Sequence, residues 1–235
     1  VKNNADITIA IKRVLLTTDS ASRNVIVEAD ETGRITDVNA YPTNISGYHD
    51  INLNIVVINR KYLQSVVLDA IAHGYTSFNR DILSRNASRR NYRVYKYDGY
   101  FANINSLTDY YHHSMELLGS PENRDQLFRV KNRPIYTKVR NSAPTKYASS
   151  SNVKNSLIAD GCIIDGNVEN SLIFRGVKVG RGATIKNSIL FQDTVIGENV
   201  FMNCVVTDKN VVVRDGRILS GHETLPFFIE KGKLV

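Results

Sequence analysis

A short segment that begins with asparagine recurs in the C-terminal part of the chain, and this repeat constrains the fold more than any other feature. The segment Asn155–Ile158 returns three times, at spacings of 15, 17 and 16 residues. The copies are Asn170–Ile173, Asn187–Leu190 and, more loosely, Asn203–Val206. Aliphatic residues also recur six positions apart within the units, and Gly, Asn or Asp residues follow them. Those three residue types tolerate the unusual backbone angles of tight corners.

This periodicity predicts a coil with three short strands per turn. Six residues per side give about eighteen per coil, so the shorter spacings indicate shortened corners. One coil cannot bury its own aliphatic row, so several coils must stack. We therefore predict a parallel β-solenoid from about residue 152 to residue 213, which resembles the left-handed β-helices of hexapeptide-repeat proteins. A β-sandwich with Asn-Gly turns is the alternative.

The first half of the chain has a mixed pattern. Period-two alternation and apolar runs predict strands at residues 6–11, 25–28, 34–38, 53–58 and 92–97. Helical spacing predicts helices at residues 62–72 and 107–118, the second with Ser106 as its N-cap. Strands that alternate with helices favour a partly parallel, Rossmann-like α/β sheet, which is incomplete because no Gly-rich phosphate loop is present. We expect an α/β domain at 1–118, a linker at 119–148 and a β-helix domain at 149–235.

Composition and charge narrow the classes of function. The net charge of +7 comes from scattered Lys and Arg residues without a nucleic-acid-binding motif, so we expect no nucleic-acid partner. No run approaches the roughly 20 apolar residues that a membrane span needs, and no signal-peptide pattern is present. Cys162 and Cys204 lack CxxC spacing, which is typical of a reducing compartment. We therefore expect a cytoplasmic protein without a membrane partner.

Two motifs at the start of the predicted solenoid resemble one enzyme family. Ala143–Tyr147 is similar to a Pro-Pro-Ala-Lys-Phe sequence, and Asn155–Ile164 is similar to a Ser-Leu-Ile-x-x-Gly-Cys-x-Ile β-helix start. With the strand–helix region and a Gly-Tyr-aromatic turn, they resemble the glucose-1-phosphate adenylyltransferase family over nearly all of the chain. The resemblance is greatest to a non-catalytic type that serves bacterial glycogen biosynthesis. It also implies that the family's Gly-Gly-x-Gly-Thr-Arg-Leu nucleotide loop is not among these 235 residues.

The resemblance implies a reaction and also shows departures from it. The family joins glucose 1-phosphate to the α-phosphate of ATP, with Mg²⁺ held by carboxylates. The resemblance places Asn103 at a metal-binding Asp, Ala40 and Tyr41 at a Glu-Lys pair of the sugar-phosphate site, and Asn52 and Asn54 in a Ser-Met-Gly strand start. Asn is a weaker ligand than Asp for a hard cation. These departures predict that this chain alone has no catalytic residues, no cofactor and no activity.

Clustered cations suggest an anion site. The resemblance implies binding of phosphorylated effectors near the junction of two domains, where Lys146 is the leading candidate and Arg133 and Arg140 are also near. A solvated basic surface is the alternative, and it applies equally to the cluster Arg80, Arg85, Arg89, Arg90 and Arg93. Neighbouring His112 and His113 do not share a helix face, so we expect no metal site there.

The predicted role is that of a regulatory or assembly subunit of glucose-1-phosphate adenylyltransferase in glycogen biosynthesis. Its partner would be a catalytic subunit or a copy of itself. A fragment of an active sugar-nucleotide pyrophosphorylase is one alternative. A hexapeptide-repeat acyltransferase is another, although no His lies between residues 152 and 213 to act as a catalytic base. A regulatory translation-initiation-factor subunit of the same superfamily is a further alternative.

Overall fold

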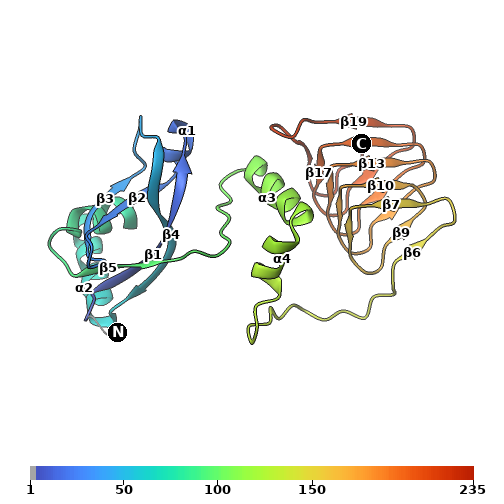
Figure 1. Ribbon diagram of the computed structural model, residues 1–235. Coiled ribbons are helices and arrows are strands. Elements are labelled where there is room, and N and C mark those ends of the chain that lie inside the picture. Colours follow the sequence, from blue (N-terminus) through green and yellow to red (C-terminus); the bar gives the residue numbers. More distant parts are fainter. Residues whose placement is uncertain (1–3) are drawn as a thin grey trace. The chain divides into compact units, whose positions relative to one another are not determined.

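The computed structural model describes residues 4–235, which form two compact units that divide after Gly99 (Figure 1). The first unit contains a five-stranded sheet with the strand order β3-β2-β4-β1-β5. Its strands are β1 (Ile7–Leu16), β2 (Val25–Ala29), β3 (Ile35–Ala40), β4 (Gly47–Ile58) and β5 (Tyr92–Lys96). Only β1 and β5 pair in parallel, and the other pairs are antiparallel. The sheet is therefore partly parallel, with the parallel pair at one edge.

One face of this sheet is buried by two helical segments. Alternate residues of β1, Ile7, Ile9 and Ile11, point into a core that also contains Tyr62 and Leu83. These last two residues come from α2 (Arg60–His73) and from the π-helix η1 (Phe78–Ser84). Helix α2 covers the predicted helix at 62–72 and ends where Gly74 adopts a φ of 67°. The sequence did not predict η1, because its apolar residues are too few to show a period.

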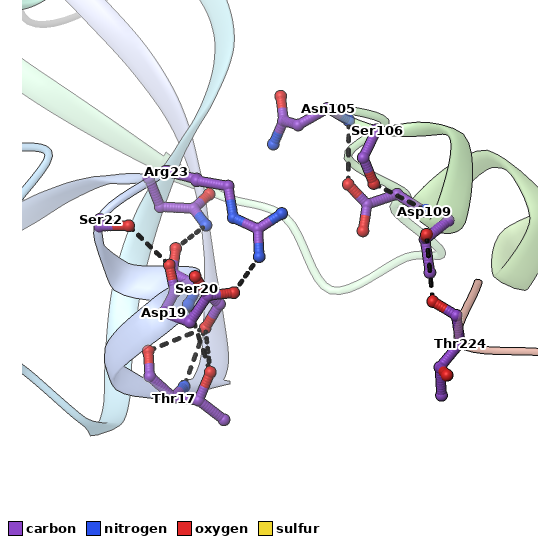
Figure 2. A network of polar contacts seen from close by, with 11 residues as sticks. Thr17, Asp19, Ser20, Ser22, Arg23, Asn105, Ser106, Asp109 and Thr224 are labelled. Carbon is purple, nitrogen blue, oxygen red and sulfur yellow. Dashed lines mark hydrogen bonds and ion pairs between the residues drawn. The ribbon is translucent and has the colours of Figure 1, made fainter.

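Two helices begin on side-chain caps, each within its own unit (Figure 2). In the first unit, Thr17 and Ser20 cap α1 (Thr18–Ala21) reciprocally: each side chain accepts a hydrogen bond from the other residue's backbone N–H. In the second unit, Ser106 accepts a hydrogen bond from the backbone of Asp109 over 3.0 Å. The Asp109 carboxylate in turn accepts one from the backbone of Asn105. The predicted cap at Ser106 is thus confirmed.

The second unit is dominated by a parallel β-solenoid, as the repeat predicted (Figure 1). Three sheets of five parallel strands form its sides. One side contains β7 (Asn152–Lys154), β10 (Asn167–Glu169), β13 (Thr184–Lys186), β16 (Phe201–Asn203) and β19 (Ile218–Ser220). The second contains β8 (Leu157–Ile158), β11 (Leu172–Ile173), β14 (Ile189–Leu190), β17 (Val205–Thr207) and β20 (Phe227–Ile229). The third contains β6 (Lys146–Tyr147), β9 (Ile163–Ile164), β12 (Lys178–Val179), β15 (Val195–Ile196) and β18 (Val212–Val213).

The asparagines of the repeat occupy one corner of the solenoid. Asn155, Asn170 and Asn187 all have a positive φ, between 39° and 47°. Their side chains form a ladder, because each amide donates to the next asparagine oxygen over 2.6–3.0 Å. Asn tolerates this left-handed backbone better than most residues do, which explains why it recurs there.

The fourth copy of the repeat lies one residue later than the sequence suggested. Ile189 pairs with Val206, so the residue that corresponds to Asn187 is Cys204, and Cys204 has the positive φ of 51°. Asn203 instead aligns with Lys186, although its side chain still accepts from Asn187. The spacing to the fourth copy is therefore 17 residues rather than 16.

Two helices precede the solenoid and belong to its unit. They are α3 (Leu107–Gly119) and α4 (Pro121–Phe128), and residues 129–145 contain no helix or strand. Tyr111 of α3 is buried with Ile189, Cys204 and Val206 of the solenoid. The compact units thus divide at 99/100 rather than at the expected boundary after 118, since the contacts of α3 are with coils far along the chain. The expected linker at 119–148 also contains α4 and the first strand, β6.

Candidate functional site

Tyr41, which the resemblance places at a lysine position, directly follows β3 in the first unit. Its backbone has a φ of 60°, which is unusual for a bulky residue, and its backbone N–H donates to the Asn24 carbonyl. The tyrosine hydroxyl accepts a hydrogen bond from the Asn79 amide over 3.1 Å, and the Arg80 guanidinium lies 5.2 Å from the ring centroid. The side chain at this position is therefore held on two sides and is uncharged.

Asn52 is a buried member of the polar cluster that contains Tyr41 and Asn79. Only 4% of Asn52 is exposed, and its amide donates to the Asn79 side-chain oxygen over 3.4 Å. Its own oxygen accepts the backbone N–H of Asn54 over 2.8 Å. Asn54 has a φ of 58°, and the β1–β4 register is interrupted nearby. Asn52 thus stabilises this irregular part of the strand, and both polar groups of its buried amide are hydrogen-bonded.

The structure therefore brings together four of the five positions that the sequence singled out as altered. Ala40 is the last residue of β3, and both Ala40 and Tyr41 pack against the core of the first unit. Asn79 joins Tyr41 to Asn52. The fifth position, Asn103, is half-buried in the second unit, within a stretch before α3 that has no helix or strand.

Asn79 and Arg80 are the members of this cluster that the sequence did not reveal. Both lie in η1, 38 residues or more from Tyr41, so only the folded sheet brings them near. Ser77 is the N-cap of η1, and its hydroxyl accepts a hydrogen bond from the backbone N–H of Arg80. Backbone N–H groups of Ser77 and Thr76 also donate to the Asp81 carboxylate and lower its pKa.

Arginine–tyrosine stacks surround η1. The three pairs are Arg80 with Tyr41 (5.2 Å), Arg85 with Tyr75 (4.8 Å) and Arg90 with Tyr62 (5.0 Å). None of these arginines forms an ion pair within the part of the chain that the structure describes. Three of the five arginines in the sequence cluster thus lie on aromatic rings rather than on carboxylates.

The cations proposed for an effector are placed separately in the second unit. Lys146 begins β6, and its backbone N–H donates to the Cys162 carbonyl over 2.9 Å while its side chain is exposed. Arg133 and Arg140 are exposed in the stretch 129–145.

The histidines and acidic residues do not gather around a metal position. Across residues 4–235, no three His, Cys, Asp or Glu side chains converge in a way that could hold an ion. His112 bonds the Glu223 carbonyl oxygen through Nε2 over 2.9 Å, whereas His113 lies 3.1 Å from the Glu116 carboxylate. Burial raises the pKa of the Cys162 thiol, which favours its protonated form.

The fold defines a class of protein in which an α/β sheet unit is followed by a C-terminal hexapeptide-type left-handed β-helix. Residues 142–223 match the family described as GlmU-like, C-terminal hexapeptide. Over 181 residues the chain is 38% identical to the glycogen biosynthesis protein GlgD of Bacillus subtilis (strain 168), covering 77% of this chain and 52% of that protein.

Two further relatives agree with this assignment. The chain is 40% identical over 217 residues to the glycogen biosynthesis protein GlgD of Geobacillus stearothermophilus, covering 82% of this chain and 63% of that protein. It is 29% identical over 236 residues to the glucose-1-phosphate adenylyltransferase of Acetivibrio thermocellus, covering 96% of this chain and 52% of that enzyme. The chain thus spans 52% to 63% of the length of these relatives. It is a homologue of GlgD proteins and glucose-1-phosphate adenylyltransferases, which confirms the resemblance seen in the sequence.

Within residues 4–235, no helix combines the length and the apolar character that crossing a bilayer requires.

Proposed function

We propose that this chain acts in glycogen biosynthesis as a regulatory or assembly subunit of a glucose-1-phosphate adenylyltransferase and has no adenylyltransferase activity alone. The names of its GlgD and adenylyltransferase relatives support the pathway. The cluster at Tyr41 supports the loss of catalysis, and it is the observation that carries the proposal.

Tyr41 lacks the positive charge that favours binding of a sugar phosphate. The family binds a sugar phosphate with a lysine at this position, as the resemblance implies, and a phenol cannot replace that positive charge. The Tyr41 hydroxyl is also engaged by Asn79, and Asn52 is engaged by the backbone of Asn54. The polar groups of the cluster therefore bond mainly to one another.

The residues present do not fit the Mg²⁺ of the active family. Asn103 offers a neutral amide where the resemblance implies a carboxylate, and Mg²⁺ prefers carboxylate ligands. No alternative carboxylate cluster is found among residues 4–235.

Two measurements test the proposal. Purified chain with ATP, Mg²⁺ and glucose 1-phosphate is expected to release no pyrophosphate above the enzyme-free rate. The chain co-expressed with a glucose-1-phosphate adenylyltransferase subunit is expected to co-elute with it and to change its turnover or its response to phosphorylated effectors. Robust turnover by the chain alone would contradict the loss of catalysis, and separate elution would contradict the subunit role.

A further inference from the structure

Helix α2 presents an exposed aliphatic stripe to solvent. Tyr62 and Val66 of this helix point into the core of the first unit and are at most 9% exposed. On other sides of the helix, four large aliphatic residues remain open. They are Leu63 (40% exposed), Val67 (48%), Leu68 (69%) and Ile71 (75%). A contiguous row of this kind on a helix is a typical protein-docking surface.

The stripe is symmetric along the helix axis. Leu63 and Ile71 each lie four residues from Val67, so all three fall along one side of the helix. Two copies of α2 that pack antiparallel around a two-fold axis at Val67 would place Leu63 of one copy opposite Ile71 of the other. An isologous interface requires this self-complementarity, because the same patch contributes from both sides.

The charges at the two ends of α2 favour the same arrangement. The first turn has two cations, Arg60 and Lys61, and no acidic residue, which opposes the positive end of the helix's own dipole. Asp69, in the C-terminal half, likewise lies toward the negative end, where its carboxylate is 3.1 Å from the His73 Nδ1. In an antiparallel pair, the cations of one helix meet the carbonyl end of the other, one turn from its Asp69. Charges that are unfavourable within one helix thus become favourable between two.

We propose that α2 is a self-association surface through which two copies of this chain pack antiparallel around Val67. Leu63, Val67, Leu68 and Ile71 form the apolar centre of this interface, and Arg60 and Lys61 form its charged ends. The proposal does not depend on the subunit role in glycogen biosynthesis, because it concerns contact between identical chains.

A cysteine at the two-fold axis tests the register directly. Val67→Cys places one thiol beside its symmetry mate, so mild oxidation is expected to give a disulfide-linked dimer. Lys61→Cys is the matched control on the same helix. Its symmetry mate lies twelve residues away along the axis, about 18 Å at 1.5 Å per residue, which is too far for a disulfide. The native Cys162 and Cys204 are both buried and free, so they do not compete.

Mass in solution gives the second measurement. The wild-type chain is expected to show at least twice its 26.4 kDa in light scattering at micromolar concentration. Val67→Glu puts two carboxylates against each other and is expected to halve the mass of the assembly. The residue is half-exposed, so circular dichroism should show an unchanged fold.

Selective cross-linking of Val67→Cys together with a halved mass for Val67→Glu supports the proposal. A wild-type mass of 26.4 kDa at all concentrations overturns it. Equal cross-linking of Val67→Cys and Lys61→Cys, or an unchanged assembly for Val67→Glu, also overturns it and shows that another surface, or another protein, is responsible for association.

Discussion

The hydroxyl group of Tyr111 donates a hydrogen bond to the backbone carbonyl oxygen of Asn187 over 2.8 Å. The contact fixes α3 to the asparagine corner of the β-helix, and the Tyr111 ring is 3% exposed against Ile189, Cys204 and Val206. Burial raises the pKa of the Tyr111 phenol, so the group stays protonated and able to donate. This residue makes α3 part of the β-helix unit.

Tyr111→Phe is expected to destabilise the second unit without unfolding it. The substitution leaves the ring in place but removes the donor, and an unpaired buried carbonyl reduces the free energy of unfolding by about 1–2 kcal/mol. Urea denaturation followed by circular dichroism measures the loss. Tyr136→Phe is the control, because Tyr136 is 91% exposed and its hydroxyl should contribute nothing. Equal midpoints for both variants would contradict the role of the hydrogen bond.

The case of α3 shows what local sequence can reveal. The helix itself was predictable, because Ser106 provides a cap and the apolar spacing is local. Its membership of a unit was not, because the partner of Tyr111 lies 76 residues away. The same limit applies to the Tyr41 cluster. The resemblance singled out Tyr41 and Asn52, but their link through Asn79 depends on how η1 packs on the sheet.

Ser106 provides a second test of α3. Ser106→Ala removes the acceptor for the Asp109 N–H and is expected to reduce the free energy of unfolding by about 1 kcal/mol, whereas Ser106→Gly should cost only a few tenths because Gly is itself tolerated at N-caps. Thermal unfolding of the three proteins gives the comparison. Identical melting temperatures for wild type and Ser106→Ala would show that water replaces the cap.

The sequence repeat correctly predicted a β-solenoid, but it placed the fourth copy one residue too early. The sequence placed the start of the fourth copy at Asn203, but the fourth corner uses Cys204 at a φ of 51°. The sequence contains an asparagine at position 203 because that side chain completes the amide ladder from the adjacent strand, and this asparagine matches the start of the other copies. The inward aliphatic positions were easier to predict, since Ile158, Ile173 and Leu190 align residue by residue through backbone pairing.

Asn187 carries two separable contributions to the corner. Asn187→Gly loses the side-chain hydrogen bonds to Asn170 and Asn203 but keeps a backbone that accepts the φ of 46°. Asn187→Ala loses the same bonds and also strains the backbone, so it should be less stable than the glycine variant by about 1–2 kcal/mol. Urea denaturation of both variants measures the difference. A more stable alanine variant would show that the corner relaxes out of the left-handed region.

The pair of Asp160 and Arg175 predicts a pH dependence. The Arg175 Nε donates to the Asp160 carboxylate over 3.0 Å and is the largest cause that lowers the pKa of this carboxyl below its usual 3.8. A lowered pKa in the folded state means that the stabilisation is fully present above the unfolded value of 3.8 and is lost as the pH falls through the lower folded value. Arg175→Gln should therefore raise the Asp160 pKa toward 3.8, as read from an NMR titration of its carboxyl carbon. The stability difference between wild type and this variant should shrink only below that pH.

Arg181→Gln is the matched control, because Arg181 pairs with Glu198 at 4.0 Å instead. An Asp160 pKa that is unchanged in Arg175→Gln, or equally raised in Arg181→Gln, would show that general surface charge rather than this hydrogen bond sets the value.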